Sequence, residues 1–348
     1  MKKQKSLTNS EIAAFCRQTA LIIQAGITPA EGMDILIHDT IHESGKALLQ
    51  EISDACNQGS NFYQALERTG VFPPYVVKLI ALGEESGNLD SVLSSLADYY
   101  EREESISDNI RSAVAYPLIM IGMMLLIILV LITKVLPIFQ QVFEQLGTQM
   151  TPLAESLMHT GNVLSQYAIA IFVVFLFLII ACIIAYKTPL GKTSVKRFLA
   201  SFPFTKGFYD KVAAGRFASG MYLCFTSGMD TYHGLDMIAE IVENDEMAHK
   251  ISLCKDEMEQ HADLPEALGK AKIFSNLYSR MIAVGFRSGS IDTVMKRIAS
   301  HYEEETDKQL ARIVSIIEPT LVIILSLMVG IILLSVLLPL MGIMSSIG

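Results

Sequence analysis

Hydrophobic positions along the chain follow two patterns, short amphipathic stretches and long apolar runs. Residues 8–111 place apolar side chains three and four positions apart, the spacing of helices with one buried face, and no stretch keeps a period of two for long. Residues 114–136, 167–186 and 319–340 are apolar over lengths that can cross a bilayer, for which about 20 residues suffice. The pattern therefore predicts an all-α membrane protein with three transmembrane helices.

The chain also contains an internal repeat. Leu79–Glu103 and Met281–Glu305 align without a gap and share 11 of 25 residues, whereas chance would give roughly 1–2. The same offset of 202 positions aligns most of both polar halves of the chain. We therefore expect two tandem cytosolic six-helix bundles, one at 8–111 and its repeat at 211–312.

Capping signals place several helix starts. Thr28, Pro29 and Glu31 combine an N-cap residue, a proline at the first helical position and a carboxylate at the third. Asn61 in the first copy and Asp263 in the second are expected to cap equivalent helices.

The distribution of basic residues predicts how the three spans are oriented in the membrane. Five of them follow the second span closely: Lys187, Lys192, Lys196, Arg197 and Lys206. Residues 137–166, by contrast, contain no lysine or arginine. Because translocated loops are poor in both residues, the 137–166 loop is expected outside and residues 187–312 in the cytoplasm. Three crossings then place the N-terminus in the cytoplasm and the C-terminus at the exterior of a cytoplasmic (inner) membrane.

The charge composition limits the classes of molecule that the chain is expected to bind. Hydrophobic residues make up 51% of the 348, and the net charge is −9. Residues 1–111 contain 16 acidic and 9 basic residues, and residues 187–312 contain 17 of each. Neither polar half has the basic excess of a nucleic-acid-binding protein, so nucleic acid is excluded as an expected partner.

Catalytic and cofactor motifs are not found. The chain has no phosphate-binding glycine loop of the G-x-x-x-x-G-K-[ST] or G-x-G-x-x-G type, and no H-E-x-x-H or G-x-S-x-G. We expect no enzyme activity, no catalytic or metal residues and no cofactor. The cysteines are scattered and are expected to be reduced thiols that behave as small hydrophobic residues: Cys16, Cys56, Cys182, Cys224 and Cys254.

Two polar patterns leave alternatives open. His38 and His42 have the spacing that turns two side chains the same way on a helix, where they could hold a metal, although a solvated helix end is the favoured interpretation. Acidic residues also gather before the first and third spans, at Glu101, Glu103, Glu104 and Asp108, and at Glu303, Glu304, Glu305 and Asp307. A solvated face is favoured there, with a docking surface for a basic partner or a divalent-cation site as alternatives.

The most distinctive part of the repeat is a turn followed by a long helix. Each copy has two turn glycines and a proline at the start of a span, and we expect these residues to form a structural joint: Gly83, Gly87 and Pro117, and Gly285, Gly289 and Pro319. The copies differ where Glu84-Glu85 in the first is replaced by Phe286-Arg287 in the second. These turns are the candidate partner-binding sites: Glu84, Glu85, Ser86, Asp90, Phe286, Arg287 and Asp292.

These features together resemble one family. LGEESGNLD (Leu82–Asp90), AYP (Ala115–Pro117) and AGITP (Ala25–Pro29) are similar to motifs of the type II secretion system F-type proteins, and the resemblance covers about residues 10–342. It implies a non-enzymatic platform protein of type II secretion or type IV pilus assembly. Such proteins form homo-oligomers and couple a cytosolic hexameric secretion ATPase to extraction of pilin or pseudopilin helices, alongside other inner-membrane assembly proteins.

A subunit of a membrane transporter or channel is the competing class. It would require ionisable residues inside the spans and more crossings than three. The sequence places no Asp, Glu, Arg or His in the middle of a span, which favours the platform protein.

Overall fold

The computed structural model describes residues 6–131, a few positions between 134 and 141, residues 203–242 and residues 244–347. Every regular element within these ranges is a helix. The expectation of an all-helical chain is confirmed for them. The expected second span, 167–186, lies outside the described residues, as does almost all of the 137–166 loop.

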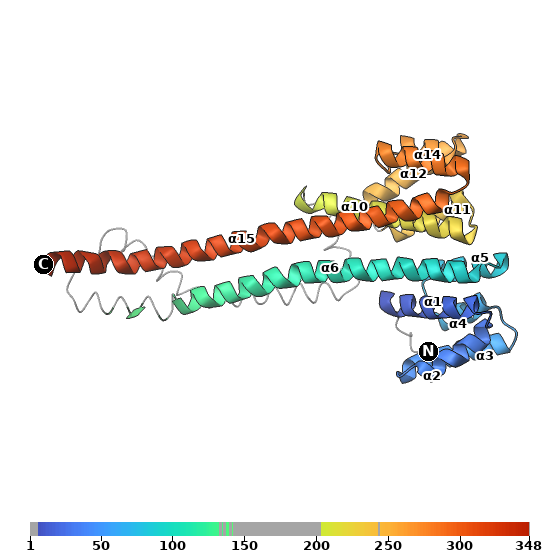
Figure 1. Ribbon diagram of the computed structural model, residues 1–348, viewed down its shortest axis with the longest axis horizontal. Helices are drawn as coiled ribbons and strands as arrows, with labels where there is room; N and C mark the ends of the chain where they lie inside the picture. Colours follow the sequence, from blue (N-terminus) through green and yellow to red (C-terminus); the bar gives the residue numbers. More distant parts are fainter. Residues whose placement is uncertain are drawn as a thin grey trace. The chain divides into compact units, whose positions relative to one another are not determined.

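Each half of the described chain has five helices followed by a much longer one (Figure 1). In the first half these are α1 (Asn9–Gln24), α2 (Pro29–Asp39), α3 (Glu43–Asn57), α4 (Phe62–Thr69), α5 (Pro74–Ser86) and α6 (Leu89–Val130). In the second they are α10 (Pro203–Ser227), α11 (Thr231–Ile241), α12 (Asp245–Glu259), α13 (Leu264–Lys270), α14 (Asn276–Ser288) and α15 (Ile291–Ile347).

The internal repeat is confirmed helix by helix. Helices α2, α3 and α5 begin and end 202 positions before α11, α12 and α14, and α6 begins 202 positions before α15. The copies differ at their first helix. Helix α10 begins at Pro203, before the expected start of the second bundle at residue 211, whereas α1 begins at Asn9.

Local sequence explains where several helices begin. The Thr8 hydroxyl accepts a hydrogen bond from the Glu11 backbone N–H, and the Glu11 carboxylate accepts one from the Thr8 backbone N–H at 2.7 Å, which completes a capping box. Thr28 caps α2 through a bond from the Glu31 N–H, with Pro29 in the first turn. The predicted cap at Thr28 is therefore confirmed.

One compact unit combines Met1–Asn109 with Phe204–Lys308. It contains both the first bundle, α1–α5 with the start of α6, and the second bundle, α10–α14 with the start of α15. Buried side chains from the two bundles belong to one connected hydrophobic core, in which Phe62 and Phe217 are among the largest fully buried residues. Burial of such aromatic rings is the main stabilising contribution to a core of this kind.

The other unit, Ile110–Pro203 with Gln309–Gly348, includes the apolar stretches of α6 and α15. Both helices are long and apolar enough to cross a membrane. Large apolar side chains on them are exposed, including Ile119 and Met123 in α6 and Ile323 and Leu327 in α15, as a lipid-facing surface requires.

Candidate partner-binding turns and the contact between the bundles

The two candidate turns have the same backbone geometry. Gly87 and Gly289 end α5 and α14 in the left-handed conformation, with φ of 72° and 70°. The next residue in each turn donates its N–H back across the helix end, from Asn88 to the Gly83 carbonyl at 2.8 Å and from Ser290 to the Gly285 carbonyl at 2.9 Å. This is the Schellman arrangement, in which a residue with a β-carbon would be strained at the glycine position.

Gly83 and Gly285 lie where the following helix packs closest. A β-carbon on Gly83 would come within 2.9 Å of Val92, and one on Gly285 within 2.6 Å of Val294. Both positions therefore let the long helix fold back against the one before it. The close contact places Val92 of α6 against α5 and Val294 of α15 against α14.

Glu84 has a structural partner within the first bundle. Its carboxylate oxygens accept hydrogen bonds from the backbone N–H groups of Phe62 at 2.8 Å and Tyr63 at 3.0 Å, at the start of α4. Asn61 occupies the N-cap position, but its side chain makes no capping bond. Asn61 thus holds the predicted N-cap position, but Glu84 of α5 provides the acceptor that its own side chain does not.

The second copy caps the equivalent helix differently. Asp263 accepts a hydrogen bond from the Glu266 N–H at 2.9 Å and so caps α13 through its own side chain. Glu84 accepts from the first two N–H groups of α4, whereas Asp263 accepts from the third N–H of α13, and Pro265 at the position equivalent to Tyr63 has no N–H. Phe286, 44% exposed, stands at the position equivalent to Glu84. The two copies therefore satisfy the start of this helix with different acceptors.

The remaining turn residues differ in exposure. Glu85 and Ser86 in the first copy and Arg287 in the second are exposed. Asp90 and Asp292 are half-buried in the first turns of α6 and α15, where the positive end of the helix dipole favours a carboxylate. The exposed side chains are therefore the ones available to a partner.

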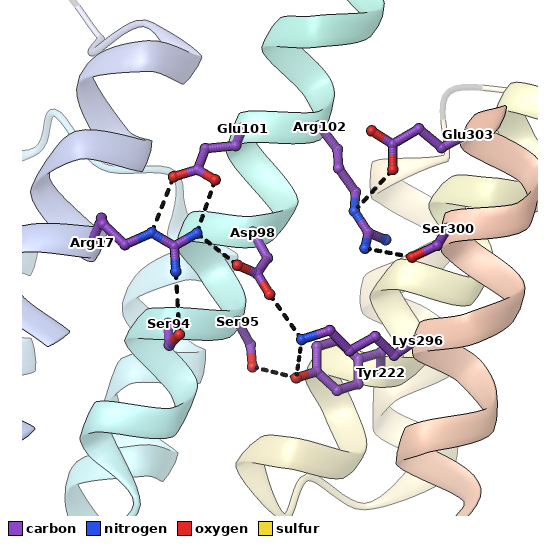
Figure 2. A network of polar contacts seen from close by, with 10 residues as sticks. All are labelled: Arg17, Ser94, Ser95, Asp98, Glu101, Arg102, Tyr222, Lys296, Ser300 and Glu303. Atoms are coloured by element: carbon purple, nitrogen blue, oxygen red, sulfur yellow. Dashed lines mark hydrogen bonds and ion pairs between the residues drawn. The ribbon is translucent and has the colours of Figure 1, made fainter. Parts of the chain in front are cut away.

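A second polar cluster joins the two bundles (Figure 2). The Arg17 guanidinium of α1 binds Glu101 through two hydrogen bonds of 3.1 and 2.8 Å and Asp98 through one of 2.6 Å, both on α6. Asp98 also accepts a hydrogen bond from Lys296 of α15 at 3.0 Å, and Lys296 lies over the ring of Tyr222. Asp98 is therefore shared between a cation of each bundle.

Two further ion pairs extend this contact. Arg102 of α6 lies 3.3 Å from the Glu303 carboxylate and donates to the Ser300 hydroxyl at 2.9 Å, both on α15. Arg216 of α10 binds Glu103 of α6 through two bonds of 2.8 and 2.6 Å, and the two side chains are only 16% and 13% exposed. The favoured interpretation of these acidic clusters as solvated faces is therefore wrong for Glu103, which is paired and largely buried.

Electrostatic surroundings shift several pKa values in the contact. Burial alone would raise the pKa of Asp98, but hydrogen bonds from Arg17 and Lys296 hold it below its ordinary value. Glu303 shows the opposite outcome, because its burial raises its pKa more than nearby Arg102 lowers it. The hydrogen bond from Arg17 to Glu101, with that to Asp98, raises the pKa of the guanidinium further. Asp98 and Arg17 are therefore both charged at neutral pH, in a contact that is only partly exposed to water.

Sequence reasoning missed the cations of this contact. Arg17, Arg216 and Lys296 each occur in one copy only, and the equivalent position in the other copy holds a serine or an alanine. A charge present in one copy of a repeat is the signal that could have identified them, because an asymmetric contact uses a different surface of each copy and so needs a given charge in only one of them.

The possible histidine metal site is not formed. Helix α2 ends at Asp39, Thr40 is extended, and His42 precedes α3 as its N-cap, so His38 and His42 do not share a helix. Across the part of the chain that the structure covers, no cluster of three or more His, Cys, Asp or Glu side chains has the geometry of a metal site.

The cysteines in the described ranges are free thiols, as predicted. They are Cys16, Cys56, Cys224 and Cys254. Burial raises the pKa of the Cys16 and Cys224 thiols to about 12, so both remain protonated and behave as small core residues. Cys182 lies outside the described residues.

Comparison with known proteins gives a consistent result. The profile of the family described as type II secretion system (T2SS), protein F, matches the chain twice, at residues 15–137 and 217–339, the same 202 positions apart at both ends. The type IV pilus assembly protein PilC of Thermus thermophilus is 28% identical over 97% of this chain and 84% of its own length. PilC of Pseudomonas aeruginosa is 26% identical over 99% and 92%. The type II secretion system protein F of Aeromonas hydrophila is 25% identical over 97% and 87%.

Proposed function

Because the chain belongs to the type II secretion system protein F family, we propose that it is the inner-membrane platform protein of a type IV pilus or type II secretion machine. In this role it couples a cytosolic hexameric ATPase to the extraction and polymerisation of pilin or pseudopilin subunits. The proposal assigns the chain no catalytic step of its own. It acts by holding soluble and membrane-embedded partners together.

One observation carries the proposal: the family profile matches each copy of the repeat in the register of the helices. The two long apolar helices supply the membrane part that a platform requires. A strain that lacks the gene should lose its surface pili or its secreted substrate while the ATPase and pilins are still made. Normal pili and secretion in that strain would rule out the proposal.

We propose three crossings of the membrane, with the N-terminus in the cytoplasm and the C-terminus outside. The two apolar helices and the cluster of basic residues after residue 186 support this topology. Alkaline phosphatase fused after residue 150 or at the C-terminus should be active, and the same enzyme fused after residue 230 should be inactive. The opposite pattern at either exterior position would exclude this topology.

For the ATPase contact we propose the exposed acidic end of α5. Glu85 is exposed there, whereas Glu84 caps α4 and its substitution would disturb the first bundle. Glu85→Arg is therefore the cleaner test. It should weaken binding of the purified ATPase to the full chain in detergent, measured by pull-down or interferometry, by about tenfold.

Arg287→Glu provides the matched control, because it reverses the charge at the equivalent exposed position of the second copy. That variant should bind the ATPase as the wild type does if the contact belongs to the first bundle. Unchanged binding of Glu85→Arg would rule out this surface while leaving the platform role intact. A loss confined to Arg287→Glu would move the contact to the second turn, which includes Phe286 and Asp292.

We also propose that the turn glycines, with Pro117 and Pro319, act as the structural joint of each copy. The close approach of Val92 to Gly83 and of Val294 to Gly285 supports this role for the glycines. Homo-oligomerisation and contact with pilin helices belong to the same proposal, since a platform beneath a growing filament must meet several subunits at once.

A further inference from the structure

One face of the first bundle is covered, and the equivalent face of the second is open. The face is formed by the end of α5 and the start of α6 in the first bundle, and by the end of α14 and the start of α15 in the second. Ser95 is 3% exposed, whereas its equivalent, Arg297, is exposed. Leu82 is half-buried, whereas its equivalent, Val284, is 67% exposed. The open surface, here called the α14–α15 outer face, consists of Arg280, Met281, Val284, Val294 and Arg297.

A helix of the second bundle covers this face in the first. The Ser95 hydroxyl donates a hydrogen bond to the Tyr222 hydroxyl of α10 at 3.2 Å. Burial raises the pKa of the Cys224 thiol of α10 to about 12, and the opposing influence of Lys78 places α5 near α10 at that point. This surface of the repeated fold therefore accommodates a packed helix, and in the first bundle that helix is α10.

Contacts between α14 and α15 bring the residues of the outer face together. The Tyr278 ring lies 5.7 Å from that of His301, and a β-carbon on Gly285 would come within 2.6 Å of Val294. The part of α14 between Tyr278 and Gly285 therefore runs beside the part of α15 that contains Arg297. The apolar and basic side chains of the outer face thus form one patch, on the solvent side of the two helices.

Arginines make this patch basic. Arg280 and Arg297 are exposed, and in the part of the chain that the structure describes neither guanidinium has an ion-pair partner. The arginines at the contact between the bundles are, by contrast, paired with carboxylates: Arg17, Arg102 and Arg216. The first bundle has a neutral serine where the second has Arg297. A helix that packs on the second bundle must therefore offer a carboxylate where α10 offers the hydroxyl of Tyr222.

We propose that the α14–α15 outer face docks an acidic amphipathic helix of a partner protein. Apolar side chains of that helix lie on Met281 and Val284, and its carboxylates pair with Arg280 and Arg297. Binding of a helix through its apolar face is a recurring mode of peptide recognition, and complementary charges give such a contact its specificity. The inference goes beyond the platform role and does not depend on the ATPase contact proposed for the first bundle.

The test uses the full chain in phosphatidylcholine nanodiscs and a fluorescent, stapled helical peptide of three heptads, with leucine along one face and glutamate elsewhere. Binding is followed by fluorescence anisotropy, and the signal from empty nanodiscs is subtracted. The wild type should bind this peptide at least about tenfold more tightly than a peptide with lysine in place of every glutamate. A scrambled acidic peptide, which has no apolar face, should not bind.

Two substitutions on the outer face should weaken binding of the acidic peptide. Arg297→Ser restores the residue of the first copy at that position and should weaken binding about tenfold. Val284→Glu should weaken it at least as much, because it places a carboxylate where the apolar side chains of the peptide pack. Both positions are exposed, so the fold should be retained. Arg68→Ser is the matched control, because it removes an exposed arginine from α4 of the first bundle, and it should leave binding unchanged.

Three results would overturn the proposal. The first is equal binding of the acidic and basic peptides, or tighter binding of the basic one. The second is unchanged binding of the acidic peptide in both outer-face variants. The third is a wild type that binds no peptide but forms a dimer in light scattering, with Val284→Glu monomeric, because the outer face would then belong to a second copy of this chain.

Discussion

The two bundles share a backbone design but stabilise it with different side chains. In the first, α4 is capped by Glu84, which reaches it from α5. In the second, α13 is capped by Asp263 from its own N-cap position. The first bundle packs Tyr75 of α5 against Tyr100, whereas the second packs Tyr278, one position later in its repeat, against the equivalent Tyr302. Helices α2, α3 and α5 nevertheless begin and end at positions equivalent to those of α11, α12 and α14.

This comparison shows where a duplicated fold is free to diverge. Turn glycines and close-packed positions are retained, because no other residue fits their backbone and packing. A capping acceptor can move to another element as long as the helix N-terminus is satisfied. In the second bundle Asp263 caps α13, and position 286 holds an exposed phenylalanine in place of a carboxylate. The divergent positions are the ones at which the two bundles can acquire separate contacts.

The largest expected loss of stability comes from substitutions in the shared core, and these variants test whether the two bundles unfold together. Phe15 and Phe217 occupy equivalent positions and are 8% and 0% exposed. Either Phe→Ala substitution should cost about 3–5 kcal/mol through lost burial and the cavity left behind. Because both rings belong to one connected core, each variant should shift a single transition in guanidinium unfolding of the full chain, followed by tyrosine circular dichroism. Two separate transitions, with only one affected by each variant, would show independent bundles.

The next effect concerns the ion pairs between the bundles. Arg216→Met should cost about 2–3 kcal/mol, because it leaves Glu103 charged and largely buried without its partner. Arg17→Met should cost only about 1 kcal/mol, since Glu101 is 53% exposed and water replaces the lost contact. Chemical denaturation of both variants compares them directly. Equal costs would show that burial does not set the strength of this contact.

A smaller loss of stability is expected when the acceptor at the start of α4 is removed. Glu84→Ala should destabilise the first bundle by about 1–2 kcal/mol because the start of α4 loses its acceptor. Phe286→Ala at the equivalent position should change stability by no more than about 0.5 kcal/mol. Adding Asn61→Asp to Glu84→Ala introduces the N-cap aspartate of the second bundle and should restore part of the loss. If Asn61→Asp restores nothing, the cost of removing Glu84 does not arise at the α4 N-terminus.

The smallest effect is a dependence of stability on acidic pH. The pKa of Asp98 is lower in the folded protein than the ordinary value of 3.8, through its bonds to Arg17 and Lys296. Its contribution is therefore fully present above the ordinary value and is lost as the pH falls through the lowered folded pKa. Urea unfolding between about pH 5 and pH 3 should show a smaller loss of stability in Asp98→Asn than in the wild type. Identical pH profiles would show that Asp98 is not coupled to its cations.

Part of the fold and of the candidate site was predictable because its causes are local. The caps at Thr8 and Thr28, the turns at Gly87 and Gly289 and the two long apolar helices follow from residues close together in the chain. Local patterns misled where a tertiary contact or a helix end intervened. Asn61 has the residue type of a cap, but Glu84, 23 positions later in the chain, accepts the hydrogen bonds from the start of α4. His38 and His42 have helical spacing, but the extended Thr40 separates them.

The sequence by itself determined the repeat, the order of its helices, the family and the presence of apolar segments long enough to cross a membrane. Each of these is carried by short-range periodicity or by similarity along the chain, which need no knowledge of packing. Only the tertiary structure decided that Asp98 is shared by Arg17 and Lys296, that Glu84 caps α4, and that Tyr278 packs against Tyr302. Such contacts join residues far apart in sequence, and they depend on how neighbouring helices pack, which no local pattern encodes.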